Sequence, residues 1–216
     1  MFSLRTNLPP SYDTRLNVPQ NFERFFSWGL ELRKPFKTIP EMGERLGFGI
    51  RVHPLGFMAV YLSPPSRGLH TMSIWGTARA DIFFPGNGLQ DDIHSHGFDF
   101  VSGIVSGTLL NTRHYPDFSQ CAPNGTGFVG YETRTDSEGN NHTTRATDAT
   151  VVVPEHTTER LTSGDTYTMQ PRTDFHSVDS PEGAITIFCK TPTYSGHDGL
   201  ALLLRRPESP APSESY

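Results

Sequence analysis

Two histidines separated by a single residue, His94 and His96, lie between two glycines, Gly88 and Gly107. In an extended chain alternate side chains point to the same side, so both imidazoles are expected on one face of a strand, with their Cα atoms about 7 Å apart. Glycine at each end is typical of a strand that turns sharply there. The segment therefore predicts a short barrel strand that offers two ligands to one metal ion.

The overall composition is that of a single all-β domain. The 216 residues include 20 glycines, 18 prolines and 15 phenylalanines, which suits short strands, frequent turns and an aromatic interior. A formal net charge of -5 argues against nucleic-acid binding, which needs clustered Lys and Arg. No apolar run is long enough to span a membrane, and two cysteines are too few for a disulfide framework. We therefore expect a soluble cytoplasmic protein in which Cys189 is a buried free thiol.

The first half of the chain changes from helical to strand-like periodicity near residue 48. Residues 1–47 are predicted to form an arm and two helices that pack on a barrel. The first helix starts at Asn17 and has four apolar residues on its buried face: Phe22, Phe25, Phe26 and Leu30. The second helix is expected within residues 38–47. Strand-like runs follow at 48–52, 57–62, 69–75 and 80–84.

The second half predicts the remainder of the barrel, which spans residues 48–204. Gly107 should end the metal strand, and residues 108–115 should form the returning strand. Residues 116–148 are predicted to be a hairpin insertion with its turn at 138–141. Further strands are expected at 150–153, 160–163, 167–170 and 183–190, with residues 200–204 as an edge strand or a helical turn. The Pro/Ser/Glu-rich tail, 205–216, is predicted to be flexible.

The pattern Gly-x5-His-x-His-x3-Phe-x6-Gly resembles the first motif of the cupin superfamily, where a Glu normally stands in place of Phe100. Residues 164–180 resemble the second cupin motif, with one extra residue before Pro171, and His176 stands at its histidine position. The resemblance implies a jelly-roll barrel (a double-stranded β-helix) preceded by a short helical segment. It also implies that His94, His96 and His176 are the metal ligands.

Within the cupins, a three-histidine set is most similar to that of the cysteine and thiol dioxygenases, which hold Fe(II) and oxidise a bound sulfur with O2. The similarity extends over about residues 48–192. That family carries a Ser-x-His-x-Tyr triad on a late strand, where this chain has Thr186, Phe188 and Lys190. The histidine and tyrosine of the triad are therefore absent, while the three predicted ligands remain.

Other residues of the predicted barrel are candidates to bind substrate or transfer protons. The substrate-binding candidates are Arg51, His53, His70, Phe100 and Arg113. Arg51, Arg79 and Arg113 could each pair with a carboxylate, since a guanidinium offers a planar fork of donors. The candidates for proton transfer are Tyr61, His114 and Tyr167.

We predict a mononuclear non-haem iron oxygenase that acts with O2 on a small polar substrate, such as a carboxylate-bearing amino acid or thiol. Fe(II) is the first candidate for the metal, with Zn(II), Ni(II), Mn(II) and Cu(II) as alternatives, since imidazole binds all of them. A redox-neutral lyase, isomerase or cyclase is the alternative function, and a ligand-binding cupin without catalysis is a second alternative. The sequence leaves a homodimer open.

Overall fold

The computed structural model describes residues 10, 13, 18–32, 50–52, 57–62, 70–75, 93–121, 127–135, 142–171, 173–190 and 201–205. This part of the chain contains one helix, α1 (Val18–Leu30), and strands that pair only in antiparallel fashion. The strands are β1 (Ile50–Val52), β2 (Met58–Tyr61), β3 (His70–Trp75), β4 (Ile93–His94), β5 (Phe100–Cys121), β6 (Phe128–Thr135), β7 (His142–Thr162), β8 (Thr166–Met169), β9 (Phe175–Asp179), β10 (Ala184–Lys190) and β11 (Ala201–Arg205). The prediction of an all-β protein with a short N-terminal helix is confirmed. The second expected helix, the strand at 80–84 and residues 206–216 of the expected tail lie outside the described residues, whereas Arg205, also assigned to the tail, ends β11.

Helix α1 packs by one apolar stripe, as expected, but the stripe differs at its C-terminal end. Phe22, Phe25 and Phe26 are buried, and Trp28 and Leu32 continue the buried face. Leu30 was predicted to belong to it, yet it is 43% exposed. At about 100° per residue, Leu30 lies about 140° around the helix from Phe25, so it points away from the sheet.

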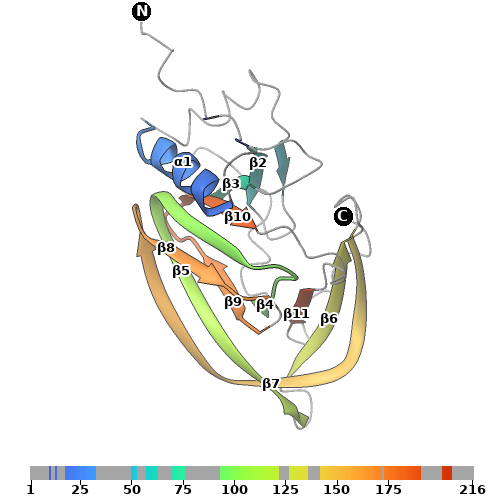
Figure 1. Cartoon of the computed structure of the whole chain (residues 1–216). Helices are drawn as coiled ribbons and strands as arrows, with labels where there is room; N and C mark the ends of the chain where they lie inside the picture. Colours follow the sequence, from blue (N-terminus) through green and yellow to red (C-terminus); the bar gives the residue numbers. More distant parts are fainter. Residues whose placement is uncertain are drawn as a thin grey trace, which may run out of the picture.

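The first sheet consists of β1, β2, β3, β10, the first part of β5, and β8. Helix α1 covers one face of this sheet (Figure 1). The side chains of Ile185, Ile187 and Cys189 on β10 join the cluster around the helix phenylalanines. The helix lies so close that a Cβ at Gly103 would be 2.6 Å from the Phe26 ring. Cys189 is buried and forms no disulfide within the described residues, as predicted.

Strand β5 belongs to both sheets and bends at Gly107. Residues before the bend pair with β10 and β8, and residues after it pair with β7 and β9. Gly107 has φ 82°, a backbone conformation that residues with a Cβ rarely adopt. The expectation that Gly107 ends the strand and that 108–115 runs back is therefore wrong. A positive φ with an adjacent bulge redirects the strand without reversing it.

The second sheet closes on itself. The second part of β5 is followed in hydrogen-bonding order by β7, β6, β11, β4 and β9, and β9 pairs again with β5. Figure 1 shows the long, curved β5 and β7 side by side. The segments predicted separately at 150–153 and 160–163 are one continuous strand, β7.

Strands β6 and β7 pair as the predicted hairpin requires, while its expected turn at 138–141 lies outside the described residues. Both strands are part of the second sheet, because β6 also pairs with β11. Strand β11, expected at an edge, lies between β6 and β4. Within the described residues, no helix is long and apolar enough to cross a membrane.

Candidate metal centre

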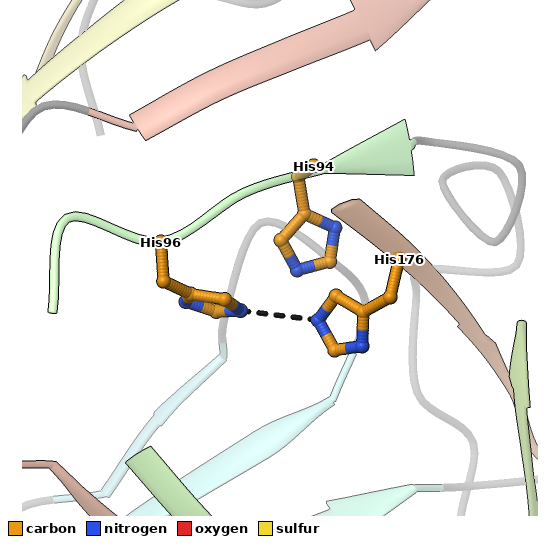
Figure 2. Close-up of side chains that lie close together, drawn as sticks. All are labelled: His94, His96 and His176. Atoms are coloured by element: carbon orange, nitrogen blue, oxygen red, sulfur yellow. Dashed lines mark hydrogen bonds between the residues drawn. The ribbon is translucent and has the colours of Figure 1, made fainter. Parts of the chain in front are cut away.

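The histidines of both motifs converge between the two sheets. His94 ends β4, where it lies directly opposite His176 of β9. Ring centroids are 4.5 Å apart for His94 and His176, 4.9 Å for His94 and His96, and 5.2 Å for His96 and His176. Figure 2 shows the three rings turned toward a common space. The predicted convergence of these side chains is present in the structure.

His96 does not share a strand with His94, which corrects the expectation of one strand carrying both. Strand β4 ends at His94, and Ser95 forms the next bonds to β11 with its backbone N–H and its side-chain hydroxyl. The Ser95 N–H donates to the Leu202 carbonyl at 2.8 Å, and the Leu202 N–H donates to the Ser95 hydroxyl at 3.0 Å. The chain then leaves the ladder, and His96 reaches the cluster from the segment that connects β4 to β5.

The distances between ligand atoms suit a shared ion. The Nε2 atoms of His96 and His176 are 3.1 Å apart. Two imidazole nitrogens bound at right angles, each about 2.1 Å from an ion, would be about 3.0 Å apart. One ligand atom from each of the three histidines lies within 4.8 Å of the others. Small side-chain rotations can therefore bring all three to one divalent ion.

His176 is prepared to act as a neutral ligand. It is 2% exposed, and its Nδ1 lies 2.9 Å from Oδ1 of Asn111. Because an amide oxygen only accepts, Nδ1 carries the proton and Nε2 keeps its lone pair. Burial, assisted by His94, His96 and other nearby cationic groups, holds the pKa of His176 well below its usual value. The imidazole is therefore neutral near pH 7, as a metal ligand must be.

An aromatic wall surrounds His96. Its ring centroid is 4.6 Å from that of Phe100, 5.4 Å from Phe98 and 6.4 Å from Phe188. Phe100 is 4% exposed and occupies the position at which the first cupin motif has Glu. Within the described residues the ligand cluster thus consists of three imidazoles and no carboxylate.

Arg113 and Tyr167, both predicted site residues, lie beside the cluster. Arg113 is opposite His176 in the β5–β9 pairing, and its guanidinium donates to the Thr168 carbonyl at 2.9 Å and pairs with Asp174 at 3.4 Å. The Tyr167 ring centroid is 6.3 Å from that of His176. Burial raises the pKa of Tyr167 to about 12, although a hydrogen bond with Ser102 and the charge of Arg113 oppose the rise. Its hydroxyl therefore keeps its proton at neutral pH.

Other predicted residues are placed elsewhere or lie outside the described part. His114 alternates with Arg113 along β5, which directs it to the other face of the sheet. There it contacts Ser177 at 2.9 Å and the His156 ring at 6.0 Å between centroids. Burial and His156 lower the pKa of His114. Tyr61 is on β2, which β3 and β10 separate from β5. All of His53 and Arg79 and the side chains of Arg51 and His70 lie outside the described residues.

Sequence reasoning missed three residues around the cluster: Phe98, Asn111 and Phe188. The signal available for Asn111 was its alternation with Leu109 along a predicted strand, which indicated that both side chains point inward. Phe98, two residues after His96, was not singled out. Phe188 was noted only at the position of the triad histidine, and its place beside His96 depends on the pairing of β10 with β5, which are distant in sequence.

No protein-family model matches the chain, and no curated protein matches it. Among the solved structures with low similarity to it are the following two. One is acireductone dioxygenase from Bacillus anthracis with a cadmium ion in its active centre, at 14% identity and a TM-score of 0.30, covering 92% of this chain and 77% of that one. The other is Drosophila melanogaster CENP-C bound to CAL1, at 7% identity and a TM-score of 0.36, covering 72% and 97%. TM-scores this low place the chain in neither family.

Proposed function

We propose that the protein is a mononuclear non-haem Fe(II) oxygenase that acts with O2 on a small polar, carboxylate-bearing substrate of the amino-acid or thiol type. The observation that carries the proposal is the convergence of three imidazoles, with ligand atoms within 4.8 Å of one another. Three neutral ligands leave the charge of a divalent ion uncompensated and leave positions for substrate and oxygen. Open positions of this kind are typical of catalytic rather than structural metal sites.

The donor set fits such an ion. All three donors are imidazoles, which suit Fe, Zn, Ni and Cu. When bound, a redox-active ion supplies electrons for the activation of O2, whereas a redox-inert ion supplies a Lewis acid. His176 contributes a lone pair at Nε2, since its Nδ1–H donates to Asn111.

Residues around the cluster would bind substrate and limit the access of water. Arg113 lies beside His176 and is 34% exposed, so its guanidinium could exchange its pairing with Asp174 for a substrate carboxylate. Phe98, Phe100 and Phe188 offer apolar surface around His96. Apolar surroundings strengthen the attraction between a bound anion and the cationic groups of the site.

One observation favours a redox-neutral alternative, such as a lyase or isomerase. Tyr167 is buried near His176, and its pKa is raised to about 12. A hydroxyl that keeps its proton can donate a hydrogen bond to a developing negative charge. Under this alternative Tyr167 would stabilise that charge as a hydrogen-bond donor, and no O2 would be consumed.

Metal analysis tests the proposal first. Protein reconstituted anaerobically with Fe(II) should retain a single ion per chain after gel filtration, and His94→Ala and His176→Ala should each lose it. His156→Ala is the matched control, because this exposed histidine lies beside His114 on the other face of the sheet. A native protein that retains no more metal than His176→Ala would contradict the proposal.

Oxygen consumption then separates the two reactions. The Fe(II)-loaded protein is screened in an oxygen electrode against amino acids and thiols, with His176→Ala as the blank. Substrate-dependent O2 uptake supports the oxygenase. Substrate turnover without O2 uptake, and its loss in Tyr167→Phe, would instead establish the redox-neutral reaction.

A further inference from the structure

Asn111 is an amide in an apolar environment. It is 0% exposed, and on β5 it alternates with Leu109, which is also fully buried. Its cross-strand partner on β9 is Val178, and Leu109 and Val178 belong to the same core cluster. Burying an amide in such surroundings is unfavourable unless its polar atoms are hydrogen-bonded.

Only half of this amide is satisfied within the described residues. Oδ1 accepts from Nδ1–H of His176 at 2.9 Å, whereas Nδ2 has no hydrogen-bond partner there. A leucine of similar size would fill the position without leaving a buried donor unpaired. Packing therefore does not explain an asparagine at this position, and its bond to His176 does.

The bond decides which nitrogen of His176 is free. With Oδ1 facing the ring, the proton stays on Nδ1, and the Nε2 lone pair faces Nε2 of His96, 3.1 Å away. With no acceptor at Nδ1, the proton could move to Nε2 and donate to His96. That tautomer has no lone pair for an ion at Nε2.

We propose that Asn111 is a positioning residue that holds His176 in the tautomer with Nε2 free, so that the cluster is ready for a metal ion before the ion arrives. The part of this inference that concerns metal binding rests on the proposed function. Its structural part concerns the ion-free protein and can be tested there.

The experiment compares Asn111→Leu with Asn21→Leu. Asn21 is equally buried, but both polar atoms of its amide bond to the backbone of Asp13, at 2.9 and 3.0 Å. The tautomer of His176 is read from its ¹⁵N chemical shifts in the ion-free protein at pH 7.5, with His176→Gln used for assignment. Zn(II) affinity is measured by competition titration, and thermal unfolding by circular dichroism.

In the native protein and in Asn21→Leu we expect the Nδ1–H form and the same Zn(II) affinity. In Asn111→Leu the Nε2–H form should predominate, and Zn(II) affinity should fall about 10- to 100-fold. Asn111→Asp keeps an acceptor for Nδ1–H and should restore the native tautomer and most of the affinity. Asn21→Leu should lose more thermal stability than Asn111→Leu, since it removes two satisfied hydrogen bonds.

The inference is overturned if Asn111→Leu keeps the Nδ1–H tautomer, or if its Zn(II) affinity equals that of Asn21→Leu. If Asn111→Leu does not fold, Asn111→Ala replaces it, because it removes the acceptor without adding bulk. Should the native protein bind no metal, the proposed function fails, while the ion-free tautomers still decide the role of Asn111.

Discussion

Gly107, the bend that carries β5 from the first sheet into the second, can be tested against a matched glycine. Gly107 and Gly164 both have positive φ, 82° and 98°. A Cβ at Gly164 would meet nothing within 4 Å, whereas a Cβ at Gly107 would overlap the Gly183 carbonyl oxygen and lie 2.9 Å from the Ala184 Cα. Alanine at either position suffers the strain of a positive φ, and only Gly107→Ala adds a collision with backbone.

The expected magnitudes follow from these contacts. For Gly164→Ala, left-handed strain of about 1–2 kcal/mol is partly offset by about 0.4–1 kcal/mol from the stiffer unfolded chain. Gly107→Ala also displaces the Gly183 carbonyl, which accepts from the Thr108 N–H at 3.2 Å. Losing that bond costs about 1 kcal/mol, and crowding the buried Ala184 adds about 1–3 kcal/mol. Gly107→Ala should therefore be less stable than Gly164→Ala by at least about 2 kcal/mol.

Urea unfolding followed by tryptophan fluorescence measures the difference. Both variants should keep the native dependence of unfolding free energy on urea, so that their midpoints can be compared directly. Equal midpoints for the two alanine variants would refute the account of Gly107. Asn111 and Arg113 follow the bend on β5, so a folded Gly107→Ala protein should also bind metal more weakly than Gly164→Ala.

Two further predictions concern protonation. The pKa of His176 is lowered in the folded protein, so the unfolded chain protonates this imidazole at a higher pH than the folded protein does. The free energy of unfolding should therefore fall as pH drops below about 6.5. His176 alone should lower the free energy of unfolding by about 1.4 kcal/mol between pH 7.5 and 5.5. The His176→Gln variant should lack this contribution, and urea midpoints at both pH values measure the difference. Burial raises the pKa of the Cys189 thiol to about 12, so in a Cys121→Ala background it should react with Ellman's reagent at pH 8 only after unfolding. Rapid reaction of the folded protein would contradict its buried position.

Elements with a strong local period could be predicted from the sequence. The stripe of Phe22, Phe25 and Phe26 follows the helical period, and the apolar run at 183–190 became β10. Such patterns are contained within a few turns or residues and need no knowledge of partners. The three histidines could be selected for the same reason, since the motif spacings are local.

What could not be predicted depends on partners far along the chain. His96 lies outside the ladder, next to Ser95, whose hydroxyl accepts from the Leu202 N–H, and nothing near residue 95 indicates that partner. The continuation of β5 through Gly107 depends on the approach of Gly183. Asn111 could be assigned to an inward face, but its partner, His176, is determined by the register of β5 and β9. Register is a property of pairing, and a shift of one residue would reverse every face.

The two faces of β10 connect the helix to the histidine cluster. Ile185, Ile187 and Cys189 pack toward α1, while Ala184 and Phe188 belong to the cluster that contains Phe100. Phe188 lies 4.7 Å from Phe100 and 6.4 Å from His96 between ring centroids. Because neighbouring side chains alternate between faces, the same backbone that the helix holds in place also sets the position of the wall beside His96. The apolar character of β10 on both faces thus has two separate causes, the helix on one side and the aromatic wall of the histidine cluster on the other.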